Sequence, residues 1–170
     1  WEPNRRCIAD RNGDDVADAE PGGVLDGVDK DRVRHNIVNG LKWGPDGWLY
    51  GRHGILASSH VGVPGTPVEK RTRINCSIFR YHPITKEFDV VCHGTTNSWG
   101  HDWDRHGQLF FINSVIGHLW HAVPGARYRR MYGNHFDKFL YELMPQTADH
   151  FHWDQGNEHW ADLKKKGMTS

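Results

Sequence analysis

The sequence of 170 residues lacks three things: net charge, closely spaced cysteines and long apolar runs. Its 21 Lys and Arg balance its 21 Asp and Glu. Nucleic acids and anionic membranes both attract proteins with a basic excess, so this balance argues against either as the main partner. No run reaches the roughly 18 apolar residues of a membrane-spanning helix, and no such helix is expected.

The three cysteines, Cys7, Cys76 and Cys92, are odd in number and widely spaced. This spacing excludes zinc knuckles and thioredoxin-type motifs, which need two cysteines a few residues apart. We therefore expect buried structural thiols. A Cys7–Cys76 disulfide stays open as the alternative if the protein is exported.

Hydrophobic residues make up only 37% of the chain, and the mean hydropathy is -0.72. Against this stand 8 Trp and 19 Gly. Disordered chains are poor in aromatic residues, so this protein is expected to fold. Helix bundles avoid so much Gly and Trp, whereas β-rich folds use both in strands and turns. The 13 His make the net charge sensitive to pH between about 5 and 8.

Short alternating runs joined by turn residues predict a meander of four strands at residues 39–43, 48–51, 76–81 and 87–92. The first turn, Gly44–Gly47, places Pro where φ is fixed and Gly where φ is positive. Two further strands are predicted at residues 108–113 and 118–123.

The hairpin pattern is used twice. Residues 40–50 can be laid over residues 100–110 at an offset of 60 positions, so that Trp43 meets Trp103. Four-stranded units repeated along a chain are typical of propeller blades. We therefore predict an all-β fold, a partial β-propeller of about two to three four-stranded blades. A helical or loop insertion is predicted near the C-terminus, because Phe136–Met144 has helical apolar spacing.

These patterns divide the chain into three regions. Residues 1–34 form an Asp/Gly-rich segment with a candidate calcium loop, and residues 35–125 form two propeller blades. Residues 126–170 hold the insertion and the start of a next, truncated blade. The chain begins with Trp1 and stops without a capping element, so we expect it to be a piece of a longer protein.

The candidate calcium loop has oxygen-bearing side chains at alternate positions. They are Asp10, Asn12, Asp14 and Asp18, and the Val16 carbonyl adds one more oxygen. Calcium prefers a flexible loop that supplies about six to eight oxygens, which predicts a calcium site here. The glycine that such loops place at the sharp turn is missing, so a solvated acidic turn is an equal alternative.

Polar residues are also predicted to meet at one rim of the repeated hairpins. His35 lies just before the first strand, and Arg52 and His53 follow the second. Histidine is a natural general base near neutral pH, and arginine suits an anionic cofactor or substrate. Solvent-exposed histidines without a role are the alternative.

A Gly-flanked stretch occupies the matching position before the repeated strand. Its Asn97, Ser98 and Trp99 offer hydrogen bonds and a stacking face for a sugar or a ring cofactor, and the stretch ends with His101 and Asp102. Turn formation alone would also explain much of this stretch. A separate run, Asp149–Asp154, alternates His with other residues and is a candidate metal or catalytic cluster, although turn polarity explains it equally well.

Four segments together resemble a known family: the loop at 10–18, His35–Gly51, Asn97–Leu109 and Ala148–Trp153. The family is the membrane-bound dehydrogenase domain common in planctomycetes and their relatives. It is in turn similar to the soluble quinoprotein glucose/sorbosone dehydrogenases, which are six-bladed propellers.

The resemblance implies roles for individual residues. In the quinoprotein enzymes a His shortly before the Gly-Pro-Asp turn takes the proton of the sugar hydroxyl, which implies that His35 is the catalytic base. Their Arg-Asn-Pro-x-Gly cofactor segment reads Thr96–Gly100 here, so Asn97 carries over and the arginine does not.

The resemblance thus implies a fragment of an exported propeller oxidoreductase, periplasmic or membrane-associated, that acts on a sugar or polyol. Pyrroloquinoline quinone and calcium are the implied cofactors, and a cytochrome c domain is the implied electron acceptor. The residues implied to bind cofactor or substrate are Arg52, His53, Asn97, Trp99, His101 and Asp102. Two alternatives stay open: a non-catalytic propeller that binds glycan or protein partners, and a metal-dependent lactonase-like hydrolase.

Overall fold

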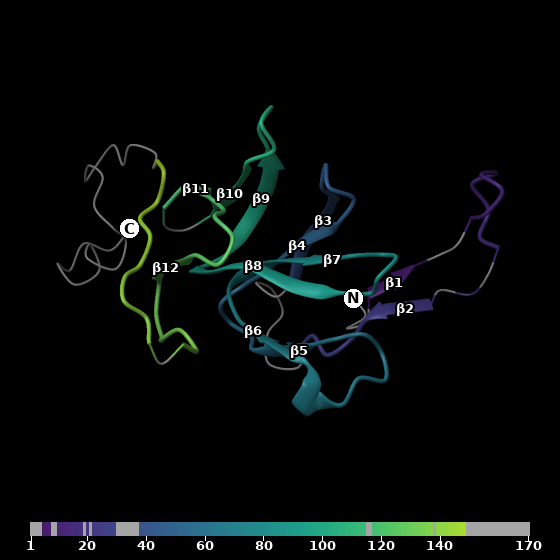
Figure 1. The fold of residues 1–170 in the computed structure, drawn as a ribbon, viewed down its shortest axis with the longest axis horizontal. Coiled ribbons are helices and arrows are strands. Elements are labelled where there is room, and N and C mark those ends of the chain that lie inside the picture. The colour runs from purple at the N-terminus through teal and green to yellow at the C-terminus, as the bar shows by residue number, and fades with distance from the viewer. Residues whose placement is uncertain are drawn as a thin grey trace.

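The computed structural model describes residues 5–7, 10–18, 20, 22–29, 38–114, 117–137 and 139–148. Within these residues the protein is all-β, with one short 3-10 helix (Figure 1). The elements are β1 (Arg5–Cys7), β2 (Gly22–Leu25), β3 (Val38–Trp43), β4 (Leu49–His53), β5 (Ser59–Val61), η1 (Val68–Lys70), β6 (Thr72–Ile74), β7 (Ser77–Tyr81), β8 (Phe88–Thr95), β9 (Ser98–Trp103), β10 (Leu109–Asn113), β11 (Leu119–His121) and β12 (Arg127–Arg130). No helix in this described part has the length and apolar character needed to cross a membrane.

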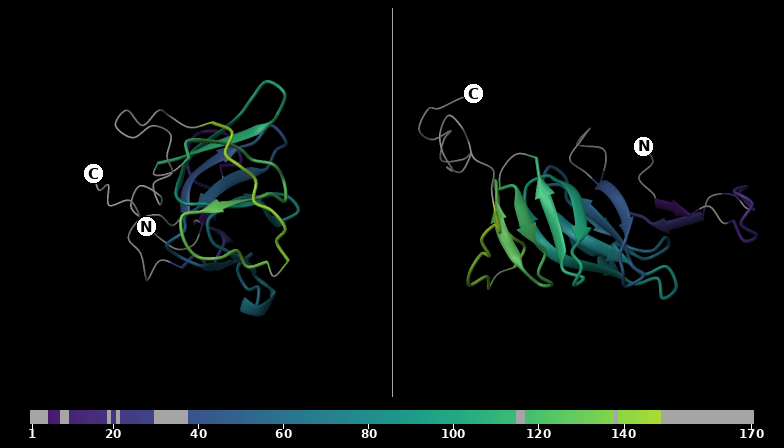
Figure 2. Two further views of the ribbon diagram at one scale, coloured as in Figure 1. Left: turned by 90° about the vertical axis from the view of Figure 1, so that its left-hand side faces the viewer. Right: turned by 90° about the horizontal axis from the view of Figure 1, so that it is seen from above.

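The largest sheet has the strand order β12-β8-β7-β4-β3. Its strands β3, β4, β7 and β8 pair antiparallel with their neighbours in chain order, which confirms the predicted meander. Strand β12 adds to the edge of β8 in parallel, although the sequence pattern did not predict it. A second sheet has the order β11-β10-β9. The far end of the β1–β2 hairpin projects from these sheets (Figure 2), and β5–β6 forms another pair.

The repeated hairpins have the same backbone geometry. In the first, Gly47 has φ +80 and its N–H donates to the Gly44 carbonyl at 3.1 Å. In the second, Gly107 has φ +78 and its N–H donates to the Asp104 carbonyl at 3.0 Å. Only glycine adopts these positive φ angles without a steric penalty, so the spacing of the glycines fixes both turns. The strand register is repeated as well, because Trp43 pairs with Leu49 just as Trp103 pairs with Leu109.

The main core lies between the five-stranded and three-stranded sheets. Phe111 and Trp120 stack at a centroid distance of 6.2 Å, and Tyr128 meets both rings edge-on. The buried members of this core are Tyr50, Ile78, Val91, Cys92, Leu109, Phe111, Trp120, Ala122, Ala126 and Tyr128. The opposite face of the five-stranded sheet is covered by residues of β2, β5 and β6. Strands β7 and β8 contribute alternating apolar residues to both cores.

The helix predicted at Phe136–Met144 is wrong at the described positions of that segment. The backbone there is irregular, and the Met144 N–H donates to the Arg127 carbonyl at 2.8 Å. Short helices are stable only when an apolar face packs against the protein. Here Phe139 is 89% exposed, so the helical spacing of apolar residues has no surface to pack against.

The expectation of buried thiols is confirmed for two cysteines. Cys76 and Cys92 are both free and fully buried, which excludes the Cys7–Cys76 disulfide in this fold. Burial raises the pKa of each thiol to about 12. Cys76 has φ +51, and its thiol donates to the Gly94 carbonyl at 2.8 Å.

Candidate functional site

Buried polar side chains gather where β4, β8 and β10 end and where β7 and β9 begin. We call this edge of the two sheets the polar end. Neighbouring antiparallel strands bring these alternating termini to the same side of a sheet. The buried polar residues of the described chain are Arg52, His53, Ser59, Asn75, Ser77, Thr95, Thr96, Asn97, Ser98, His101 and Asn113. The opposite edge carries exposed turns, among them the Gly-containing turns at residues 44–47 and 104–107.

Arg52 and His101 face each other across the two sheets. Arg52 Nη1 donates to His101 Nδ1 at 2.9 Å, and both residues are buried. A guanidinium has no acceptor and stays protonated, so His101 Nδ1 must be the acceptor. His101 is therefore neutral, with its proton on Nε2. Burial, followed by the positive charges of Arg52 and Lys42, lowers the pKa of His101 to about 4.

Gly40 makes room for this pair. A Cβ added at Gly40 would collide with the Arg52 guanidinium, and the residue has φ +32. A glycine is needed at this position because the Arg52 side chain lies against the β3 backbone. No described carboxylate pairs with Arg52, and burial lowers the pKa of its guanidinium.

Five buried side-chain atoms have no hydrogen-bond partner within the described chain: four belong to residues at the polar end, and the fifth belongs to His101, in the middle of β9. They are Arg52 Nε, Ser77 Oγ, Thr96 Oγ1, Asn97 Oδ1 and His101 Nε2. An unpaired buried polar atom costs about 1–3 kcal/mol, and native proteins keep few of them. Unpaired buried atoms of this kind are typical of a site that is completed by a ligand or by ordered water. The nitrogens of Arg52 and His101 are hydrogen-bond donors, and the Asn97 oxygen is an acceptor. The two hydroxyl groups can both donate and accept.

His53 is enclosed by the protein. Its side chain is 0% exposed, its Nδ1 donates to the Gly54 carbonyl at 2.8 Å, and its Nε2 accepts from Ser59 Oγ at 2.8 Å. Ser59 Oγ in turn accepts the Asp29 N–H at 3.0 Å. Burial lowers the pKa of His53 to about 4. Both ring nitrogens are hydrogen-bonded inside the protein, so neither is available to a ligand.

The remaining predicted residues differ in their placement. Asn97 is buried at the polar end, and its Nδ2 donates to Ser114 Oγ at 3.2 Å. Trp99 is the second residue of β9 and is 53% exposed, which leaves part of its ring surface accessible. Asp102 is exposed and forms an ion pair with Lys42 at 2.7 Å. The structure thus pairs Arg52 with His101, places Asn97 at the polar end and leaves Asp102 on the surface.

The candidate calcium loop is exposed, and its oxygens accept backbone hydrogen bonds. Asp10 Oδ1 accepts the Gly13 N–H at 2.7 Å, which contributes most to lowering the pKa of Asp10. Asp14 Oδ1 accepts the Val16 N–H at 2.9 Å, and Asp18 Oδ2 accepts the Arg11 N–H at 2.5 Å. Nowhere in the described part of the chain do three or more His, Cys, Asp or Glu side chains gather as metal ligands would. The arrangement is that of the acidic turn, and the calcium site stays a prediction.

Two predicted groups lie outside the described residues. They are the base candidate His35 and the histidine cluster at Asp149–Asp154.

Comparison with protein families places the chain in one of them. A family model described as "Domain of unknown function (DUF7133)" matches residues 2–161. The chain belongs to the DUF7133 family. Searches of the curated proteins and of the solved structures each find no match.

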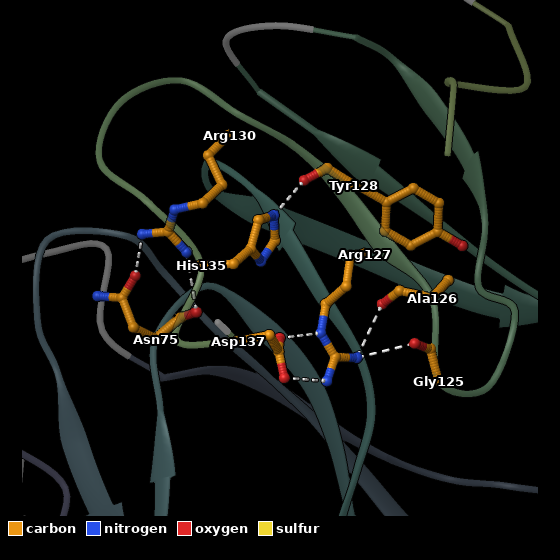
Figure 3. A network of polar contacts seen from close by, with 8 residues as sticks. All are labelled: Asn75, Gly125, Ala126, Arg127, Tyr128, Arg130, His135 and Asp137. Carbon is orange, nitrogen blue, oxygen red and sulfur yellow. Dashed lines mark hydrogen bonds and ion pairs between the residues drawn. The ribbon is translucent and has the colours of Figure 1, made fainter. Parts of the chain in front are cut away.

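Sequence reasoning missed a second polar network in this DUF7133 domain. Arg127, Arg130 and His135 bond to residues from other segments beside β12 (Figure 3). The visible signal is the basic run Arg127-Tyr128-Arg129-Arg130 in a chain without net charge. Sequence alone does not reveal the partners, because Asn75 is 55 positions away from Arg130.

Proposed function

We propose that the polar end binds a small polyhydroxylated molecule, and that the chain is part of a β-propeller oxidoreductase that acts on a sugar or polyol. The observation that carries the proposal is the set of five unpaired buried polar atoms, on four residues at the polar end and on His101, which bonds to Arg52. Sugars and polyols present hydroxyl groups that both donate and accept, so they can satisfy a mixed set of protein donors and acceptors.

The repeated hairpins support the propeller architecture. The β3–β4 and β9–β10 hairpins share turn geometry and register, and the sheets that contain them pack face to face around one core. In this proposal β3, β4, β7 and β8 form one blade, and β9, β10 and β11 belong to the next. The ligand site would then lie where two adjacent blades meet, between Arg52 and His101.

The chemistry of the two described histidines bears on which residue acts as a base. His101 Nδ1 accepts from Arg52, so its Nε2 carries a proton and acts as a donor. His53 has both nitrogens bonded inside the protein. Neither is placed to take a proton from a substrate hydroxyl. The base in this proposal is therefore His35, three positions before β3, whose first residue Val38 pairs with His53.

The implied cofactors fit the described residues to different degrees. Pyrroloquinoline quinone is an anionic ring that accepts a hydride from the substrate. The N–H groups at Arg52 Nε and His101 Nε2 suit one of its carboxylates, and they supply part of what the missing arginine before Asn97 would. Calcium is proposed at the loop of residues 10–18 only on its oxygen spacing, and calorimetric titration of the chain with calcium tests it. Export to the periplasm or membrane surface and a cytochrome c acceptor belong to the same proposal.

A second candidate function is favoured by Trp99. Trp99 is half-exposed and follows Asn97 by two positions in the sequence. Aromatic rings commonly stack on the faces of sugars. The alternative is a non-catalytic propeller that binds glycans through Trp99 and the polar end. The hydrolase alternative rests on His150 and His152, which lie outside the described residues, and no described observation favours it.

The deciding experiment uses the full-length protein reconstituted with the quinone and calcium. We expect dye reduction with at least one member of a sugar and polyol panel, abolished by His35→Ala and weakened by Arg52→Gln. Arg105→Gln, in the exposed repeated turn, is the matched control and should leave activity unchanged. Sugar binding that needs Arg52 but brings no dye reduction would establish the glycan-binding alternative. Neither binding nor activity across the panel would refute both functions.

A further inference from the structure

A second site can be derived from the network beside β12, apart from the Arg52–His101 pair. Arg127 and Arg130 of β12 differ in how their positive charges are balanced (Figure 3). Arg127 binds Asp137 with two bonds, Nε to Oδ2 at 2.5 Å and Nη2 to Oδ1 at 3.2 Å. This carboxylate neutralises Arg127, and the ion pair lowers the pKa of Asp137.

Arg130 is held by neutral oxygens instead. Its Nε donates to the Tyr132 carbonyl and its Nη1 to the Asn75 carbonyl, each at 3.3 Å, and its Nη2 donates to Asn75 Oδ1. No carboxylate within the described chain pairs with this half-buried guanidinium. Burial lowers the pKa of Arg130, which is the cost of removing an unneutralised charge from water. Fixed geometry with an uncompensated positive charge suits an anion.

A cavity of about 270 Å³ opens beside this guanidinium. Arg129, Arg130 and His135 line it on the polar side, and Leu140 and Leu143 supply apolar surface. His135 Nε2 donates to the Tyr128 carbonyl at 2.8 Å, which fixes the ring at the cavity wall. Burial lowers the pKa of His135, and the positive charges of Arg130 and Arg127 lower it further. Among the residues that line the cavity there are two arginines and one carboxylate, Asp137.

We propose that this cavity is a binding site for an organic monocarboxylate, whose carboxylate lies against Arg130 and whose apolar body lies against Leu140 and Leu143. Asp137 also lines the cavity and limits the charge that it accepts. One negative charge is favoured by Arg130, whereas a polyanion would lie too close to this carboxylate. Contact with the two leucines favours a ligand with an apolar body over a bare inorganic anion.

Calorimetry with benzoate as the probe tests the proposal on the 170-residue chain. We expect saturable binding that Arg130→Gln weakens about tenfold or more, the effect of losing one charge-assisted contact. Arg130→Lys keeps the charge and should retain part of the affinity. Arg105→Gln, in a distant exposed turn, is the matched control and should leave binding unchanged.

Two further probes separate the parts of the proposal. Benzyl alcohol has the same apolar body without the charge, and inorganic phosphate has charge without an apolar body. Both should bind more weakly than benzoate. Equal binding of either probe, or no saturation by benzoate, would overturn the site.

Arg130 also bonds to Asn75, so Arg130→Gln could unfold the chain. Leu143→Ser leaves the guanidinium in place and should still weaken benzoate, and unchanged benzoate affinity in this variant would overturn the proposal. As an independent readout, benzoate should raise the pKa of His135 in NMR titration, because its charge offsets the two arginines. An unchanged His135 titration at saturation would place benzoate elsewhere.

Discussion

Acid is expected to destabilise the fold through histidines that are held neutral inside it. His53 has no exposed surface, and burial lowers its pKa from 6.5 to about 4. Between these two values the unfolded chain binds a proton at His53, and the folded protein does not. The stability that depends on neutral His53 is therefore fully present above pH 6.5 and falls as the pH drops towards 4.

The size of this effect follows from the width of the window. Each pH unit within it removes roughly 1 kcal/mol from the free energy of unfolding per histidine, so His53 accounts for about 3 kcal/mol over the whole window. His101 is buried against Arg52 and has a similarly lowered pKa, so it adds a second contribution of the same sign. Marginal domains have about 5–15 kcal/mol in total, which makes the expected loss easy to measure.

Urea unfolding followed by tryptophan fluorescence provides the assay, at steps of about one pH unit from about pH 7.5 to 4.5. His53→Gln cannot titrate, so its free energy of unfolding should fall less steeply than that of the wild type across the window. His106→Gln, at an exposed turn, is the control and should keep the wild-type slope. Equal slopes for His53→Gln and wild type would refute the reasoning, whatever their absolute stabilities.

Two other predictions follow from local geometry. Gly40→Ala should displace the guanidinium packed against it and destabilise the fold by about 1–3 kcal/mol. Gly65 has φ +88 in open space, so Gly65→Ala controls for the strain of a positive φ without a steric collision; equal losses of stability in the two variants would contradict the steric argument. Cys76 and Cys92 should not react with a thiol reagent such as DTNB in the native state, because burial keeps both thiols protonated. Reaction without unfolding would disprove this.

Local patterns predicted the strands that pair with neighbours in the chain. Residues 39–43 and 48–51 flank a turn whose glycine dictates the backbone, so β3 and β4 follow from local chemistry. Strands with remote partners were missed. β12 forms because Gly94 of β8 lets the Tyr128 backbone approach, and a Cβ at that glycine would collide with the Tyr128 carbonyl. The helix predicted at Phe136–Met144 is wrong for a related reason. Its apolar residues have helical spacing, but whether another segment packs against them depends on the tertiary structure, and Phe139 remains exposed.

The sequence by itself determined the β-rich class, the meander, the duplicated hairpin and the residue types available at the polar end. These depend on turn glycines and on alternation, which act over a few neighbouring positions. Only the tertiary structure decided what those residues do. It enclosed His53, exposed Asp102 and paired Arg52 with His101, which fixes the His101 proton on Nε2. Burial, hydrogen-bond roles and pKa values all depend on which distant segments come into contact, and local sequence patterns do not specify those contacts.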